Sequence, residues 1–352
     1  MINSEKNTLV ILTPGFPESE SDSSCLPLQQ SFVRNFKAMH PQLNIVVFSF
    51  QYPFVEKTYS LFDTTVTSFN GQNKGGLARL MLRQPINKAL KRIHTNSNII
   101  GILSFWYGEC ALIGHRFAKQ YELKHFCWLM GQDARETNKY PERALIPADE
   151  LIALSDFLAD EFEKNHHIRP TQVVAAGVDP SAYDKLSPVK DIDILGAGSL
   201  IPLKQFDQFI EIIAELKKEI PNIRCKLSGD GREKENLSSL VAEHHLSENI
   251  ELTGELPHRD LLKLMQRSKL FLHTSSYEGF SGVCLEAMGG GAKVISFCRP
   301  MKNNMEHWHV VNTMEEMKQQ AMAILQNKNT QYNPAFPYSI SETVNGIANL
   351  FS

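Results

Sequence analysis

The sequence predicts an α/β fold with two doubly wound, Rossmann-like domains. Short apolar runs alternate with helical patterns along the whole chain, which is typical of parallel sheets covered by helices. A length of 352 residues also suits two domains that each bury a core. Between Pro180 and Lys190 the chain is polar, carries two prolines and shows no period. We therefore expect the domain boundary there.

The first half of the chain carries short apolar runs separated by amphipathic segments. The runs predict strands at Leu9–Thr13, Asn44–Phe50, Asn98–Ser104, His125–Met130, Leu151–Leu154 and Thr171–Ala175. The amphipathic segments predict helices at Leu28–His40, Ile86–Ile93, Glu109–Gln120 and Asp156–Asn165. Ser155 is the expected N-cap of the last helix.

After the boundary a second α/β series begins. Its expected strands are Asp193–Gly196, Arg224–Ser228, Ile250–Thr253, Lys269–His273 and Lys293–Phe297. Its expected helices are Lys204–Glu219, Arg232–His244, His258–Gln266, Gly282–Gly289 and Met314–Gln326, and a last helix is expected within Tyr338–Phe351. Two such domains in tandem predict an active site in the cleft between them, because ligands bind outside the carboxyl ends of the strands.

Composition excludes several classes of protein. The formal charge of −3 argues against general nucleic-acid binding. The six cysteines are scattered, without a CxxC pair or a His cluster at metal spacing, which indicates reduced thiols in a cytoplasmic protein without a metal site. The first eight residues are polar, and no apolar run approaches the length of a spanning helix, so we expect a soluble protein or one that at most rests on the inner face of the cell membrane.

The most informative segment runs from Tyr277 to Met288. It lies between two expected strands and places Glu278 and Glu286 around a glycine-containing turn that opens a helix. A helix start directs backbone N–H groups at an anion, and the two carboxylates can accept hydrogen bonds from hydroxyl groups. This combination suits a nucleotide sugar, with the diphosphate on the amides and the hydroxyls on the glutamates.

The same segment resembles the signature of the retaining glycosyltransferases of family 4, also called glycosyl transferases group 1. That signature joins a glutamate, Gly-Phe and a second glutamate followed by Ala-Met, and it stands here from Glu278 to Met288 with Gly291 after it. The resemblance implies the GT-B fold, in which two Rossmann-like domains face each other across a cleft. It is strong from about Asp193 to Phe297.

The resemblance implies roles for individual residues of the second domain. Glu278 and Lys204 would be catalytic, with Glu278 orienting the donor sugar and Lys204 neutralising the leaving diphosphate. Ser199 stands where the family usually has an arginine, which leaves more of the charge compensation to the amides of residues 281–283. The residues expected to bind the donor are Glu286, Ser199, Gly229, Arg232, Leu256, Phe280, Ser281, Gly282 and Val283.

The first domain matches the family less closely. Gly15 and Phe16 follow the first strand, where family members carry a loop near donor and acceptor. Met130 replaces the histidine that normally bonds the donor sugar, and Gln132, Asp133 or Arg135 could substitute for it. We therefore expect contacts with donor or acceptor from Gly15, Phe16, Gln132 and Asp133.

As the resemblance implies, residues 1–185 would form the acceptor-side domain, 186–333 the nucleotide-sugar domain, and 334–352 a helix that packs back on the first domain. The enzyme would be a hexosyltransferase that moves a sugar from a nucleoside diphosphate sugar to a hydroxyl of a glycan or lipid-linked acceptor, with retention. Glycan, polysaccharide or glycolipid synthesis is the expected role. No cofactor or metal would be required.

Other functions remain open from the sequence alone. A nucleotide-sugar 2-epimerase shares the fold and needs no acceptor, and a non-catalytic nucleotide-sugar-binding protein would be consistent with Met130 and Ser199. A glycoside hydrolase is less suitable, because its two carboxylates must flank the scissile bond.

One charge feature lies outside the family argument. Between Thr64 and Gly108 there is no acidic residue, and residues 74–93 interleave Lys and Arg with apolar side chains. Such a stretch can rest on an anionic membrane, or it can be a solvated helix face with an apolar core side. Pro85 is expected to break it into two short helices.

Overall fold

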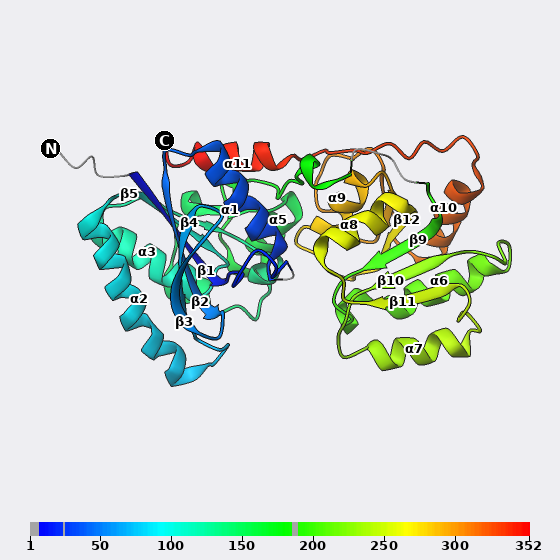
Figure 1. Ribbon diagram of the computed structural model, residues 1–352, viewed down its shortest axis with the longest axis horizontal. Coiled ribbons are helices and arrows are strands. Elements are labelled where there is room, and N and C mark those ends of the chain that lie inside the picture. Colours follow the sequence, from blue (N-terminus) through cyan, green and yellow to red (C-terminus); the bar gives the residue numbers. More distant parts are fainter. Residues whose placement is uncertain (1–6, 24, 185–188) are drawn as a thin grey trace. The chain divides into compact units, whose positions relative to one another are not determined.

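The computed structural model describes residues 7–23, 25–184 and 189–352, and it divides into two compact units. Unit 1 comprises residues up to Ala176 together with Ile340–Ser352, and unit 2 comprises Gly177–Ser339. The expected boundary between residues 185 and 186 lies outside the described residues. Each unit is an α/β structure with its own sheet and core (Figure 1).

The described residues of unit 1 form an eight-stranded sheet in the order β3-β4-β2-β1-β5-β6-β7-β8. Its strands are β1 (Asn7–Gly15), β2 (Asn44–Tyr52), β3 (Glu56–Leu61), β4 (Thr64–Phe69), β5 (Asn98–Phe105), β6 (His125–Trp128), β7 (Leu151–Ala153) and β8 (Gln172–Val173). All neighbouring pairs are parallel except β3 with β4. The central strand β1 is buried on both faces, as its continuous apolar run requires.

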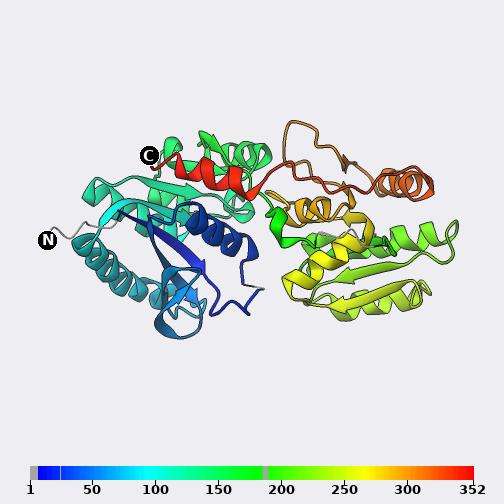
Figure 2. The same ribbon diagram turned by 45° about the horizontal axis from the view of Figure 1, so that its top comes forward.

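The helices of unit 1 cover both faces of this sheet. They are α1 (Pro27–Met39), α2 (Gly76–Asn96), α3 (Glu109–Tyr121), α4 (Tyr140–Ala144), α5 (Asp156–His166) and α11 (Ile340–Ala348), with short 3-10 turns η1 (Gly131–Ala134) and η2 (Ala148–Glu150). The last helix, α11, packs beside α1 although more than 300 residues separate them in sequence (Figures 1 and 2). The Thr343 hydroxyl on α11 donates to the Ala175 carbonyl at 2.7 Å, and Phe351 packs on Phe126.

Unit 2 carries a six-stranded parallel sheet in the order β11-β10-β9-β12-β13-β14. Its strands are β9 (Ile192–Ala197), β10 (Cys225–Ser228), β11 (Ile250–Gly254), β12 (Ser268–His273), β13 (Lys293–Ser296) and β14 (Trp308–Val310). Its helices are α6 (Phe206–Lys217), α7 (Lys234–Glu243), α8 (His258–Arg267), α9 (Gly282–Gly289) and α10 (Met314–Gln326), and the 3-10 turns are η3 (Pro180–Ala182) and η4 (Pro202–Lys204). Helix α6 packs with α7 and α10, and α8 packs with α9.

Most predicted elements are present, often one or two residues longer or shorter. The predicted cap of α5 is confirmed, because the Ser155 hydroxyl accepts the Leu158 N–H at 3.0 Å. The predicted break at Pro85 is wrong, since α2 runs continuously through it. Proline leaves the carbonyl of Met81 without its helical donor. Met81 is 74% exposed, so this part of the helix faces solvent.

The β3–β4 hairpin and β14 were not predicted. Phe62 and Asp63 both have positive φ, near 52° and 53°, in the two-residue loop that joins the hairpin strands. Such loops are usually signalled by Asn-Gly or Asp-Gly, and Phe-Asp gives no comparable signal. Strand β14 spans only three residues, which is too short for a periodic pattern.

Candidate functional site

In unit 2 most of the predicted donor residues follow β9 and β12, while Gly229 and Arg232 follow β10 and Leu256 follows β11. Strands β9 and β12 are neighbours in the sheet, but the chain leaves them in opposite directions, since β9 leads to β10 on one side and β12 leads to β13 on the other. A point of this kind leaves a crevice that open α/β sheets use for ligands. The loop after β9 carries Ser199 and Lys204, and the loop after β12 carries Glu278.

Lys204 and Glu278, the two predicted catalytic residues, are brought together. The Lys204 ammonium donates to Glu278 Oε1 and forms an ion pair with it, and both side chains are 18% exposed. The Ser275 hydroxyl donates to the same carboxylate at 3.0 Å. The Lys204 carbonyl accepts the Thr274 hydroxyl at 2.7 Å, which fixes the end of η4 against the loop after β12. The pair is therefore held from both loops.

Glu278 is ionised over the whole neutral range. Burial alone would raise its pKa, but the hydrogen bond from His273 and the charge of Lys204 outweigh burial and lower the pKa to about 2. His273 ends β12 and is buried, with Nε2 3.5 Å from Glu278 Oε1 and 3.1 Å from the Ser281 hydroxyl. Burial lowers the pKa of His273, so the imidazole is neutral at pH 7.

The start of α9 lies beside this carboxylate. Ser281 is the N-cap, and its hydroxyl contacts His273 instead of capping the helix. The first N–H groups of a helix have no partner within it, so the amides of Gly282 and Val283 are available to an anion. Both residues are half-buried, whereas Phe280 is 8% exposed and packs edge-to-face on Tyr338.

Glu286 lies one turn further along α9 and is oriented by a histidine. His258 Nε2 is 2.7 Å from Glu286 Oε1, and the Glu286 carbonyl accepts the Tyr183 hydroxyl at 2.8 Å. The Glu286 side chain is 22% exposed, which leaves it accessible to a ligand. Its second carboxylate oxygen can accept hydrogen bonds from a diol.

The glycine turns after β9 and β10 touch each other. Gly229 has a φ of 147°, and a Cβ there would lie 1.9 Å from the Gly198 carbonyl oxygen. The Gly229 N–H donates to the Gly254 carbonyl at 2.9 Å. Gly229 therefore serves close packing of two loops. Of the other predicted donor residues, Ser199 is exposed and Leu256 is half-buried, while the Arg232 side chain is 73% exposed beside Glu233.

The four residues of unit 1 that were predicted to contact donor or acceptor differ in how far they are buried. Phe16 is fully buried against Phe62 and leaves no side-chain surface for a ligand, because the end of β1 turns into the core. Gly15 is also buried. Gln132 is exposed, and Asp133 is 4% exposed with its carboxylate accepting the N–H groups of Tyr107 at 2.9 Å and Met130 at 2.8 Å.

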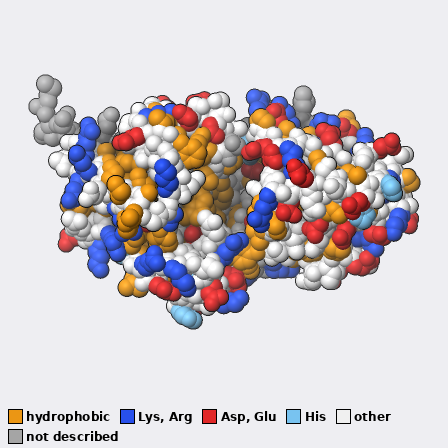
Figure 3. All heavy atoms as spheres, turned by 90° about the horizontal axis from the view of Figure 1, so that it is seen from below, with side chains coloured by type: hydrophobic (Ala, Val, Ile, Leu, Met, Phe, Trp, Pro, Cys, Tyr) orange, Lys and Arg blue, Asp and Glu red, His pale blue; other side chains and the backbone are white. Residues whose placement is uncertain are grey.

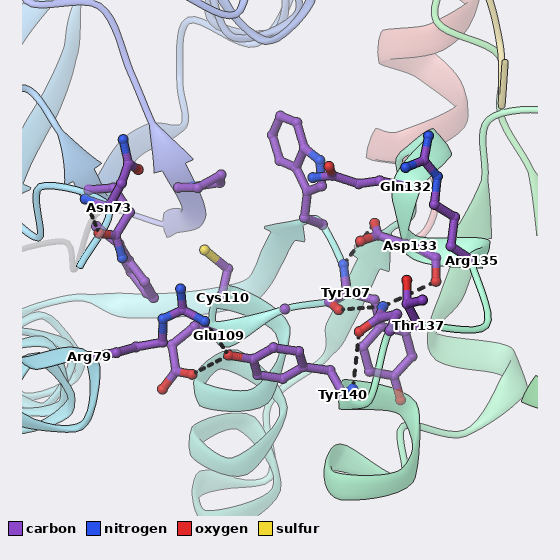
Figure 4. A pocket seen from close by; sticks show the side chains of 16 residues that line it. Asn73, Arg79, Tyr107, Glu109, Cys110, Gln132, Asp133, Arg135, Thr137 and Tyr140 are labelled. Atoms are coloured by element: carbon purple, nitrogen blue, oxygen red, sulfur yellow. Dashed lines mark hydrogen bonds between the residues drawn. The ribbon is translucent and has the colours of Figure 1, made fainter. Parts of the chain in front are cut away.

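Gln132 and Asp133 line a pocket of about 430 Å³ that lies wholly within unit 1 (Figure 4). Its walls come from the carboxyl ends of β1, β2, β5 and β6, again where the chain leaves neighbouring strands β1 and β5 in opposite directions. The polar lining residues are Gln51, Asn73, Arg79, Trp106, Glu109, Gln132, Asp133, Arg135, Thr137, Asn138 and Tyr140.

Sequence reasoning missed several residues of both sites. His258 contacts Glu286, which lies 28 residues further along the chain, and His273 contacts Glu278, which lies five residues further. No sequence motif links either pair. Arg79, Glu109 and Tyr140 meet only through the fold. The basic character of residues 74–93 is visible in the sequence, but it does not reveal that Arg79 belongs to a pocket.

A His–Glu cluster was also not predicted from the sequence. Nδ1 of His115 and Nδ1 of His125 lie 2.9 and 2.7 Å from the same oxygen of Glu150. The three residues are the one group of ligating side chains within the described ranges that could hold a metal ion. They lie at the amino-terminal end of β6, away from the predicted functional residues of unit 1, and the two imidazoles satisfy the carboxylate without an ion.

The sequence of unit 2 matches a known family. Residues 181–330 match the family described as glycosyl transferases group 1. Unit 2 thus contains a glycosyl transferases group 1 domain. Solved structures extend the likeness to both units. The Anabaena protein HepE, crystallised with UDP and glucose, has a TM-score of 0.66 at 16% identity, and the match covers 97% of this chain and 95% of HepE.

The pneumococcal O-GlcNAc transferase GtfA, in complex with UDP and GlcNAc, has a TM-score of 0.68 at 13% identity, with 98% of each chain covered. The chain has the GT-B fold.

Curated relatives align over less than half of this chain. The GtfA component of the UDP-N-acetylglucosamine–peptide N-acetylglucosaminyltransferase of Streptococcus pneumoniae is 27% identical over 150 residues, which are 42% of this chain and 29% of that protein. One component of the phosphatidylinositol N-acetylglucosaminyltransferase of Arabidopsis thaliana is 27% identical over 164 residues, 45% of this chain and 37% of that protein. The alignments thus span about a third of these relatives.

No helix within residues 7–23, 25–184 and 189–352 combines the length and apolar character needed to cross a bilayer.

Proposed function

We propose that the protein is a retaining glycosyltransferase of family 4 that moves a hexosyl group from a nucleoside diphosphate sugar to a hydroxyl acceptor. The group 1 domain and the GT-B fold support this proposal. The UDP in the HepE and GtfA structures makes a UDP-sugar the first donor to test. Glycan, polysaccharide or glycolipid synthesis in the cytoplasm is the proposed role.

The observation that carries the proposal is the Lys204–Glu278 ion pair beside the start of α9. Before donor binds, each charge compensates the other. A diphosphate would take Lys204 as its counterion and accept hydrogen bonds from the amides of Gly282 and Val283. Glu278 would then be released to accept hydrogen bonds from the sugar hydroxyls, while Glu286, oriented by His258, would hold the ribose diol.

The low pKa of Glu278 determines which role it can take. Before donor binds, the Glu278 carboxylate has a pKa of about 2, so it is a weak base at neutral pH and carries no proton to donate. Glu278 therefore suits binding and orientation better than acid–base catalysis. This agrees with a retaining mechanism in which the acceptor attacks from the leaving-group side and a donor phosphate oxygen takes its proton. No metal is needed for charge compensation in this scheme.

The proposal is tested by incubating the protein with a panel of UDP-, GDP- and ADP-sugars and a panel of glycan acceptors, and by determining the anomeric configuration of the product by NMR. We expect transfer with retention. Glu286→Ala should mainly raise the donor KM, and Glu278→Ala should mainly lower kcat. Unaltered transfer in both variants would refute these roles, and epimerised donor without acceptor would favour the 2-epimerase.

We also propose that α2 contacts the surface of an anionic membrane. Leu77 and Met81 are 78% and 74% exposed, and Leu80 is 49% exposed, in a helix that carries Lys and Arg side chains and no acidic residue. Figure 3 shows hydrophobic and basic side chains adjoining on the surface of unit 1. Each cation near such a surface contributes about 1 kcal/mol.

Co-sedimentation with vesicles containing anionic lipid should exceed co-sedimentation with neutral vesicles, and Leu77→Ser with Met81→Ser should abolish the excess. Equal sedimentation with both vesicle types would contradict membrane contact.

A further inference from the structure

The pocket of unit 1 has a size suited to a small ligand. Its volume of about 430 Å³ falls in the usual range for ligand sites, about 300–1,000 Å³. It opens at the carboxyl ends of parallel strands, where the strand order reverses. Residues from five separate segments converge there: the end of β1, the end of β2, the stretch from Asn73 into α2, and the segments after β5 and after β6.

The negative charge of Glu109 is already neutralised. Its carboxylate accepts two hydrogen bonds from the Arg83 guanidinium, one of them at 3.3 Å, and a third from the Tyr140 hydroxyl at 2.9 Å. The Glu109 side chain is only 8% exposed. Glu109 therefore adds no net negative charge to the pocket.

Arg79 keeps its positive charge at the pocket wall. Its guanidinium donates to the Tyr140 hydroxyl at 3.2 Å and has no carboxylate within ion-pair distance in the described part of the chain. Figure 4 shows Arg79, Tyr140 and Glu109 joined along one wall, with Gln132 and Arg135 on another. A guanidinium presents five donors, so most of those of Arg79 are left for a ligand.

Asp133 does not cancel this charge. Its carboxylate is directed at the N–H groups of Tyr107 and Met130, and burial raises its pKa to about 7 against the effect of those two bonds. The α3 N-terminus at Gly108 also borders the pocket and has no side-chain cap, which adds a small positive potential. The pocket is consequently electropositive.

The rest of the lining suits a carbohydrate. Amide side chains of Gln51, Asn73 and Gln132 can each donate to and accept from hydroxyl groups. Trp106 and Tyr140 provide aromatic surface, which packs against the apolar faces of sugar rings. Trp106 has a φ of 67°, a conformation that is strained for a bulky residue and that is concentrated at ligand sites.

We propose that this pocket binds the acceptor and that the bound part of the acceptor is a sugar carrying a carboxylate or a phosphate, which Arg79 recognises. The inference rests on the proposed function, since it names the acceptor class of that transferase. Arg79 would set acceptor specificity, and the amides and aromatic rings would hold the sugar ring.

The test compares three probes by ligand-observed NMR: methyl glucuronide, glucose 1-phosphate and methyl glucoside. Both anionic probes should bind about tenfold or more tightly than the neutral one, because a charged hydrogen-bonded pair is gained. A result in which only one anionic probe binds tightly would identify the anionic group. Equal affinity for all three would overturn the proposal.

Arg79→Gln should remove the preference for anionic probes and leave the weak binding of methyl glucoside unchanged. Arg92→Gln, on the same helix outside the pocket lining, is the matched control and should keep the preference. Should Arg79→Gln fold poorly, as judged by circular dichroism, Asn73→Ala offers a second variant on an exposed residue and should weaken all probes. Preference retained in folded Arg79→Gln would overturn the proposal.

Binding of UDP to unit 2 is measured in the same samples. Loss of UDP binding with retained anionic-sugar binding would count against the proposed transferase but not against the pocket. Retained UDP binding without a preference for the anionic probes would count against the pocket proposal but not against the proposed transferase.

Discussion

Replacement of Glu278 by glutamine provides a quantitative test of the electrostatics at the centre of unit 2. The pKa of Glu278 lies at about 2 in the folded protein, below the ordinary value of 4.5 that applies when the chain is unfolded. The folded state therefore binds the proton more weakly than the unfolded state. The ionised carboxylate stabilises the fold above pH 4.5, and this contribution is lost as the pH falls through 4.5 towards 2.

The magnitude follows from the two pKa values. Each pH unit between them corresponds to about 1.4 kcal/mol, so the contribution at pH 7 is about 3 kcal/mol. At pH 3 the same linkage leaves about 1 kcal/mol. The difference in free energy of unfolding between the unmodified protein and Glu278→Gln should therefore shrink by about 2 kcal/mol from pH 7 to pH 3.

Urea denaturation followed by circular dichroism at pH 7, 5, 4 and 3 measures this difference. Carboxylates elsewhere titrate in both proteins and cancel in the comparison. Glu251→Gln is the control, because Glu251 is 61% exposed in its pair with Lys226 and such pairs contribute about 0 to 1 kcal/mol. A difference for Glu278→Gln that is the same at pH 7 and pH 3 would refute the reasoning.

Three further outcomes follow from the structure. His258→Ala should raise the donor KM about tenfold with little change in kcat, because Glu286 loses the group that orients it, whereas the exposed neighbour Arg259→Ala should change neither constant. Gly229→Ala should lower the free energy of unfolding by about 3 kcal/mol, because its Cβ would overlap a backbone oxygen. The control Gly254→Ala should lower it by only about 1 kcal/mol, because a Cβ at Gly254 meets nothing within 4 Å. Dialysis against a chelator should leave transfer unchanged; recovery of lost activity by Mg²⁺ or Mn²⁺ would show that charge compensation needs a metal.

The sequence predicted most strands of both sheets, because buried parallel strands leave continuous apolar runs. Strand β12 and helix α9 were placed within a residue of their observed bounds. The β3–β4 hairpin was missed because Phe62 and Asp63 adopt positive φ without glycine or asparagine. The continuity of α2 through Pro85 was missed because a proline usually breaks or kinks a helix interior.

At the functional sites, too, some residues could be predicted from the sequence and others could not. The donor site was predicted from the resemblance of the segment around Glu278 and Glu286 to a family signature, and the structure places Lys204 in an ion pair with Glu278. The orienting histidines were not predictable, since His258 reaches Glu286 only through the packing of α8 on α9. The Arg79 pocket was not predictable either, because its walls come from five segments between residues 14 and 140.

The central claim is that Lys204 and the start of α9 bind a nucleoside diphosphate. Isothermal titration of UDP into the unmodified protein and into the double variant Lys204→Met/Glu278→Gln tests it directly, since the double variant removes both charges and leaves neither unpaired. We expect measurable binding that weakens about tenfold or more in the double variant. UDP that binds both proteins equally would contradict the claim.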